Sequence, residues 1–313
     1  MKSLFTPIAV AASVFTTPLA AQAQEQLNYV LVSHAPDSDS WWNTIKNGIA
    51  LAGEQMDVTV EYRNPPTGDL ADMARIIEQA TASGPNGIIT TLADFDVLSG
   101  PIRDAVASGV DVIIINSGTP EQARELGALM YVGQPEYDAG YAAGQRAAGD
   151  GVESFLCVNH FIAQPASTER CTGFADGLGV DLGNQMIDSG QDPAEIKNRV
   201  MAYLNANPAT DAVLTLGPTP ADPTMLALEE MGLAGDIYFG TFDLGGNIVE
   251  GIKSGVIEWG IDQQPYLQAY LPVIVMANYH RYGVLPGNNI NSGPGFVTKD
   301  GLEKVEEFAG EYR

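Results

Sequence analysis

The chain has 313 residues, of which 45% are hydrophobic, and this is enough for one large domain or two medium ones. Its 15 Lys and Arg residues stand against 39 Asp and Glu residues, giving a formal net charge of −24. Such a surface repels phosphate backbones and anionic lipids, which argues against nucleic-acid and membrane-surface partners.

Residues 1–23 are expected to form a secretory signal peptide. Lys2 is their only charged residue, an apolar run rich in small residues follows, and the cleavage pattern AQA ends at Ala23. Prolines and threonines interrupt the run, unlike a membrane-spanning helix, which needs about 20 strongly apolar residues. We therefore expect a soluble periplasmic protein that begins at Gln24 after cleavage.

Short β-rich runs then alternate with helical segments. In the first half we expect strands at 27–33, 57–63, 86–91 and 111–116, and helices at 41–56, 69–83 and 96–109. In the second half we expect strands at 154–159, 184–188, 211–216 and 236–242, and helices at 167–179, 192–208, 223–232 and 247–255. The strand runs are nearly all apolar, as in parallel sheets covered on both faces. The pattern predicts an α/β protein with two doubly wound, Rossmann-like domains.

The remaining segments predict a hinge. A strand at 255–262, a helix at 265–283 and an amphipathic stretch at 299–312 are too few for a third domain, so they must complete the first two. The chain then crosses between the domains three times, near residues 130, 262 and 289. The expected lobes are 24–130 plus 264–288, and 131–263 plus 289–313.

Cys157 and Cys171 are the two cysteines of the chain. In an oxidising compartment an even pair favours one disulfide. Two separate buried thiols are the alternative, because free cysteine is often buried. Two cysteines without a second pair do not make a zinc cage.

Polar side chains gather at the predicted strand ends, where ligands bind in sheets of this kind. No glycine-rich phosphate loop and no G-x-S-x-G elbow is present, and the three histidines lack metal-ligand spacing. We therefore expect no cofactor, no metal and no enzyme activity. The amides, carboxylates, arginine and aromatic rings that remain suit a sugar, whose hydroxyls bind such polar groups and whose apolar faces suit flat rings.

Across the mature chain the sequence resembles the periplasmic sugar-binding proteins of the ribose- and galactose-binding class, the type I receptors of ABC importers. The motifs that carry the resemblance are INSG at 115–118, TERCTGFADGL at 168–178, GTFDL at 240–244 and DQQPYLQAY at 262–270. The resemblance implies a monomer that captures a monosaccharide between two lobes and delivers it to a membrane permease. A receptor for chemotaxis or quorum sensing, and a secreted sugar hydrolase, are the alternatives.

The resemblance also implies a set of ligand contacts. By motif position they are Asp39, Trp41, Trp42, Asn116, Arg170, Asp243 and Gln263. Thr219 corresponds less directly, and His160 is included for its place at a strand end. Six of them also have a structural explanation: packing for the two tryptophans, a turn for Asn116, a surface position for Arg170, a helix cap for Asp243 and a hinge role for Gln263.

One departure bears on the ligand. Ribose-type members usually carry an Asp–Arg pair after the fourth strand, where this chain has Asn116 and Ser117. The loss of both charges weakens the prediction of ribose. A pentose, a hexose, an amino sugar and a polyol all stay open.

Overall fold

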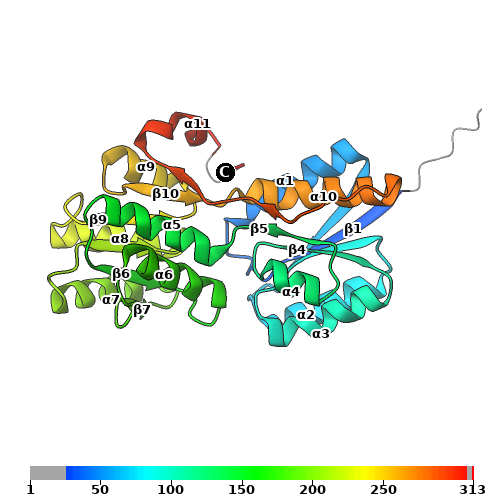
Figure 1. The fold of residues 1–313 in the computed structure, drawn as a ribbon, viewed down its shortest axis with the longest axis horizontal. Helices are drawn as coiled ribbons and strands as arrows, with labels where there is room; N and C mark the ends of the chain where they lie inside the picture. The colour runs from blue at the N-terminus through cyan, green and yellow to red at the C-terminus, as the bar shows by residue number, and fades with distance from the viewer. Residues whose placement is uncertain (1–25, 309–311) are drawn as a thin grey trace, which may run out of the picture.

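The computed structural model describes residues 26–308 and 312–313, and the expected signal peptide and its cleavage site lie outside this range. Within these residues the strands form two six-stranded sheets, one in each of two lobes (Figure 1). The predicted fold class, two doubly wound α/β domains, is confirmed. No helix in the described part of the chain has the length and apolar character needed to cross a membrane.

The first lobe contains a parallel sheet in the order β11-β5-β4-β3-β1-β2. Its strands are β1 (Leu27–Val32), β2 (Val58–Arg63), β3 (Gly87–Thr91), β4 (Asp111–Ile115), β5 (Met130–Gly133) and β11 (Ile290–Asn291). Its helices are α1 (Trp42–Met56), α2 (Leu70–Ala82), α3 (Phe95–Ala107), α4 (Pro120–Glu125) and α10 (Pro265–Tyr282). The helices α1 and α10, far apart in the sequence, lie side by side on one face (Figure 1).

The second lobe repeats this arrangement in the order β12-β10-β9-β8-β6-β7, with β12 antiparallel to β10. Its strands are β6 (Phe155–Asn159), β7 (Met186–Asp188), β8 (Ala212–Thr215), β9 (Tyr238–Phe242), β10 (Trp259–Asp262) and β12 (Gly295–Val297). Its helices are α5 (Glu136–Gly149), α6 (Pro165–Leu178), α7 (Pro193–Ala206), α8 (Pro218–Met231), α9 (Gly246–Ser254), the 3-10 turn η1 (Lys299–Gly301) and α11 (Glu303–Glu306).

The apolar strand runs are explained by burial on both faces of each sheet. In β1, Tyr29 and Leu31 join the core beneath α1 and α10, whereas Val30 and Val32 join the core beneath α2 and α3. Successive side chains of a strand point to opposite faces of the sheet. Because both faces are covered by helices, the residues that point to either face are apolar. In each sheet the strand that comes second in the sequence lies at an edge, next to the strand that comes first. This is the flavodoxin-like strand order of doubly wound folds.

Three segments join the lobes, and two of them lie later in the chain than predicted. Both β5 and β11 belong to the first sheet, where Ile290 pairs with Val132. The passages therefore fall at residues 134–135, 263–264 and 292–294, and the first and third replace those expected near 130 and 289. We therefore propose lobe boundaries a few residues later than those expected from the sequence.

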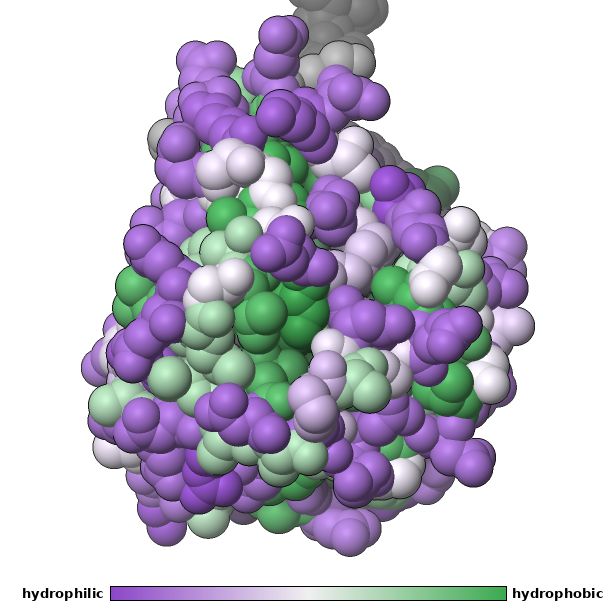
Figure 2. Space-filling model, turned by 90° about the vertical axis from the view of Figure 1, so that its left-hand side faces the viewer, coloured by the Kyte–Doolittle hydropathy of each residue, from purple (hydrophilic) through white to green (hydrophobic). Residues whose placement is uncertain are grey.

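Figure 2 views the far end of the second lobe, where an apolar area is bordered by polar residues. This lobe carries Leu226 of α8, which is 57% exposed. A shallow cavity beside it is lined in part by Met225, Ala234 and Val256. The rest of the surface in this view is mainly polar, as the charge of −24 leads one to expect.

Glycines let α5 and α6 approach each other very closely. A Cβ atom placed on Gly140 would overlap the carbonyl oxygen of Arg170, and one on Gly144 would overlap that of Phe174. Gly173 and Gly177 of α6 face the backbone of α5 in the same way. The contact fixes α6, which carries Arg170, against α5, which begins at Glu136.

Gly140→Ala is therefore expected to destabilise the protein by about 1–3 kcal/mol, because the methyl group must push two helices apart. Gly149→Ala, near the end of the same helix, is the matched control, since no atom lies within 4 Å of the added Cβ. Alanine in a helix is favoured over glycine, so the control should be neutral or stabilising. Denaturant unfolding measures both variants. Equal stability of the two would contradict the close helix contact.

Candidate functional site

A cavity of about 270 Å³ lies between the two lobes. All nine residues predicted to contact a ligand line it: Asp39, Trp41, Trp42, Asn116, His160, Arg170, Thr219, Asp243 and Gln263. Most of them follow β1, β4, β6, β8, β9 and β10, so the carboxyl ends of both sheets point toward this cavity. The structure brings the predicted set together, and the part that each residue plays in binding is proposed below.

Arg170 is held in place by a buried acid that sequence reasoning missed. Its Nε donates to Oε2 of Glu136 at 2.6 Å, its Nη2 donates to Oε1 at 2.9 Å, and its Nη1 donates to the Leu216 carbonyl at 3.1 Å. Burial acts to lower the pKa of the Arg170 guanidinium. The charge of Glu136 and its hydrogen bonds to the guanidinium act in the opposite direction, and the pKa is raised. A guanidinium has five N–H donors, so two stay available for a ligand in the cavity.

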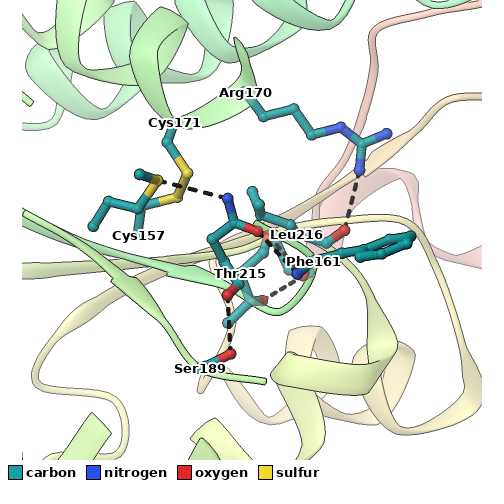
Figure 3. The surroundings of a disulfide bond; sticks show 10 residues. Cys157, Phe161, Arg170, Cys171, Ser189, Thr215 and Leu216 are labelled. Carbon is teal, nitrogen blue, oxygen red and sulfur yellow. Dashed lines mark hydrogen bonds between the residues drawn. A yellow bond between two sulfur atoms is a disulfide. The ribbon is translucent and has the colours of Figure 1, made fainter. Parts of the chain in front are cut away.

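Cys157 of β6 and Cys171 of α6 form a disulfide, with an S–S distance of 2.06 Å and a Cα–Cα distance of 5.9 Å. This confirms the predicted bridge and removes the alternative of two free thiols. Figure 3 shows Arg170 leaving α6 beside Cys171 and reaching the Leu216 carbonyl. The bridge therefore ties the middle of α6 to β6, which lies next to the edge strand β7 in the second sheet.

Replacing both cysteines by alanine is expected to lower the free energy of unfolding by about 3 kcal/mol, because the bridge closes a loop of about 15 residues in the unfolded chain. Urea unfolding of the variant and of the oxidised wild type measures the difference. Reduction of the wild type should reproduce it. An unchanged unfolding midpoint in both experiments would contradict this prediction.

A line of polar side chains runs from the first lobe through the hinge to the second. The Nδ2 of Asn116 donates to Oε1 of Gln263 at 3.2 Å and to Oε1 of Gln268 at 3.1 Å. The Nε2 of Gln263 donates to Oδ1 of Asp243 at 2.5 Å. Ser117 donates to Oδ1 of Asn116, so Asn116 has partners on both ends of its amide. The side chain of Gln263 thus contacts side chains of both lobes, and the same residue lines the cavity.

Asp243 does not cap a helix, because the N-cap of α9 is Gly245. Its backbone has a positive φ of 64°, and its carboxylate lies on the cavity wall. Burial raises the pKa of Asp243 to about 7, although Arg170 and the hydrogen bond from Gln263 oppose the rise. The carboxyl group therefore exchanges its proton near neutral pH.

The stability of the ligand-free protein should depend on pH through this group. The ordinary pKa of an aspartate is 3.8 and that of Asp243 in the folded protein is about 7, so the folded state holds the proton more tightly between these values. Stability from this group is present at low pH and is lost as the pH rises from about 4 to about 7. Asp243→Asn should remove this fall. Urea unfolding of both proteins at pH 5 and pH 8 gives the comparison, and parallel changes would contradict it.

The two adjacent tryptophans differ in burial. Trp42 begins α1 and is 2% exposed within the first core, whereas Trp41 is half-buried at the N-cap. Their rings meet edge to face with centroids 5.2 Å apart. Asp39 accepts a hydrogen bond from the Trp41 N–H at 3.1 Å, and burial raises the pKa of its carboxyl. Trp41 thus fits a ligand-facing role, and Trp42 is a core residue whose side chain also reaches the cavity.

The two histidines at the cavity are neutral near physiological pH. Burial lowers the pKa of His160 to about 4, and burial does the same for His34. The Nδ1 of His160 is enclosed and has no hydrogen-bond partner among the residues that the structure describes. An enclosed nitrogen on a cavity wall suits a ligand hydroxyl. The described residues contain no cluster of three or more His, Cys, Asp or Glu able to hold a metal.

Gln164, also missed from the sequence, joins the lobes directly. It is the N-cap of α6, and its Nε2 donates to Oγ of Ser117 in the first lobe at 3.0 Å. The same nitrogen lies 3.4 Å from Nε2 of His34. Gln164 and Pro165 precede the helix predicted at 167–179, and the structure begins α6 two residues earlier, at Pro165, which makes Gln164 its N-cap.

Residues 29–282 match the periplasmic binding protein domain family. The match covers most of the chain, so the protein belongs to this family, whose members act outside the cytoplasm. The class predicted from the sequence, a periplasmic sugar-binding protein of the ABC-transporter type, is confirmed.

Particular relatives can be named. A xylose/arabinose-binding protein of Sulfolobus acidocaldarius is 28% identical over 272 residues, which are 82% of this chain and 67% of the relative. A carbohydrate transporter of Acidothermus cellulolyticus, solved in complex with myo-inositol, is 32% identical with a TM-score of 0.83 and covers 91% of this chain and 99% of its own. A periplasmic sugar-binding protein of Legionella pneumophila is 25% identical with a TM-score of 0.77, and the match covers 86% of this chain and 100% of that protein's chain. These relatives are sugar-binding transport proteins, not enzymes.

Proposed function

We propose that the protein captures a monosaccharide or a ring polyol in the cavity between its lobes and delivers it to the permease of an ABC importer. The observation that carries this proposal is the wall of the cavity. It combines a preorganised arginine, two carboxylates and an exposed part of a tryptophan, contributed by both lobes. Carboxylates and amides accept hydrogen bonds from hydroxyls, the arginine donates to ring oxygens, and the indole covers an apolar ring face.

The ligand we propose is neutral. The charge of Arg170 is balanced by Glu136, which leaves Asp39 and the ionised fraction of Asp243 to set the local charge. An anionic sugar would meet these carboxylates at close range, which disfavours it. The first candidates are three neutral compounds. Xylose and arabinose are named for the relative from Sulfolobus acidocaldarius, and myo-inositol is bound in the structure from Acidothermus cellulolyticus.

Binding between the lobes supplies the signal for transport. A ligand that touches Asp39 and Trp41 on one side, and Arg170 and Asp243 on the other, makes all its contacts only when the lobes are closed. This difference in affinity shifts the population toward the closed form. A permease that recognises the closed form then receives loaded protein in preference to empty protein.

A thermal-shift screen tests the proposal, with D-xylose, L-arabinose, D-ribose, D-glucose, D-galactose, D-glucosamine and myo-inositol as probes. At least one neutral sugar or polyol should raise the melting temperature, because a ligand that binds only the folded state stabilises it by mass action. Titration calorimetry then gives the dissociation constant. If no compound shifts the melting temperature and none releases heat, the proposed function is wrong.

A further inference from the structure

The cleft does not end at the cavity described above. Beyond Trp41 lies a second cavity of about 230 Å³, lined among others by Ser40, Asn43 and Asp222. Pro218, the first residue of α8, lines both spaces, and Trp41 also belongs to both walls. The two cavities are therefore neighbours that share Trp41 of the first lobe and Pro218 of the second, and they are of similar size.

Asp222, which lines the outer cavity, has a buried carboxylate oxygen without a partner among the described residues. Oδ2 of Asp222 accepts a hydrogen bond from Nδ2 of Asn247 at 2.8 Å. Its Oδ1 is enclosed and has no hydrogen-bond partner among residues 26–308 and 312–313. Leaving an enclosed carboxylate oxygen without a donor is costly, so a donor from outside the protein is favoured here. Asn247 fixes the orientation of the carboxylate and leaves this one oxygen for the donor.

The chemistry of the outer space matches that of the inner one. It offers an indole edge from Trp41, a carboxylate from Asp222, and the polar side chains of Asn43 and Ser40. A ring with hydroxyl donors on its rim and an apolar face suits these groups, as it suits the inner cavity. An anion is disfavoured by the carboxylate, and no lysine or arginine lines this space.

We propose that this outer cavity is a second sugar subsite, and that the preferred ligand is a disaccharide. One ring fills the inner cavity, and the second ring lies between Trp41 and Asp222, where a hydroxyl donates to the free Oδ1. This inference rests on the proposed function, because it extends the same cleft by one ring. It changes the ligand from a single ring to a pair of linked rings.

Titration calorimetry with matched probes tests the inference. Each monosaccharide or polyol that binds is compared with disaccharides that contain it: xylobiose for D-xylose, maltose and cellobiose for D-glucose, and galactinol for myo-inositol. At least one disaccharide should bind tenfold or more tightly than its single ring. Asp222→Ala should weaken binding of that disaccharide at least tenfold and change the affinity for the single ring less than threefold.

Glu229→Ala is the matched control, since Glu229 is an exposed acid on the same helix and lines neither cavity. It should change neither affinity. Asp222→Asn keeps an oxygen for Asn247 and replaces the alanine variant if that variant fails to fold.

The outcomes separate this inference from the proposed function. Single rings that bind while every disaccharide binds more weakly would overturn the second subsite and leave the proposed function intact. A disaccharide that binds more tightly but is unaffected by the change at Asp222 would also overturn the subsite. Failure of every probe would overturn both proposals.

Discussion

Replacing Glu136 by alanine should destabilise the folded protein by about 3–5 kcal/mol, since removing one partner of a buried ion pair leaves an uncompensated charge. The side chains of Arg170 and Glu136 are only 11% and 4% exposed, so the guanidinium loses its charged partner at a place with little access to solvent. Gln134, which donates to Oε2 of Glu136 at 3.1 Å, loses an acceptor as well. Urea unfolding of the variant measures the loss.

The double variant Glu136→Leu with Arg170→Met is the informative control. It removes both charges and restores apolar packing, so it should recover much of the stability that Glu136→Ala loses. It should still bind sugar poorly, because the donors of Arg170 are gone. If Glu136→Ala unfolds like the wild type, the pair is not the buried interaction that the structure shows.

Trp42→Ala should cost about 3–5 kcal/mol of stability, as expected for truncating a large side chain in a core. Trp42 is 2% exposed and packs with α10 and β1 in the first lobe. Trp41→Ala should cost less stability and should weaken sugar binding tenfold or more, because an aromatic contact of about 0.5–1.5 kcal/mol adds to the apolar area that the ring covers. Unfolding curves and calorimetry on both variants separate the two roles.

Trp259→Phe serves as the control for these substitutions. Trp259 is fully buried in β10, where its indole N–H donates to the hydroxyl of Tyr238, and it does not line the cavity. Its loss should change stability but leave sugar affinity near the wild-type value. A Trp41→Ala protein that binds normally and unfolds several kcal/mol more easily would show that Trp41 is a packing residue.

The sequence was sufficient for the fold because both sheets bury both faces of their strands. Runs such as Val30 to Val32 are apolar at every position, and this signal is local. The ends of the first and third crossings were misplaced because they depend on the pairing of β5 with β11, which joins Val132 to Ile290. Pairing between residues so far apart in the sequence leaves no trace in either segment alone.

The site was predictable to the extent that it follows strand ends. The family resemblance assigned seven of the nine residues by motif, and all nine line the cavity, most of them just after strands. Glu136 was missed because an acid in the first turn of a helix usually faces water. Here α6 approaches α5 so closely that Arg170 meets it, and that approach depends on glycines in two separate helices.

The polar line through Gln263 has a consequence for the order of events during capture. Gln263 lies between β10 and α10, in one of the segments that join the lobes. If the lobes turn about these segments, the amide of Gln263 should move less than side chains farther from them, such as Trp41 and Thr219. We therefore propose that an arriving sugar first meets the amide of Gln263, and that the walls on either side complete the contacts afterwards.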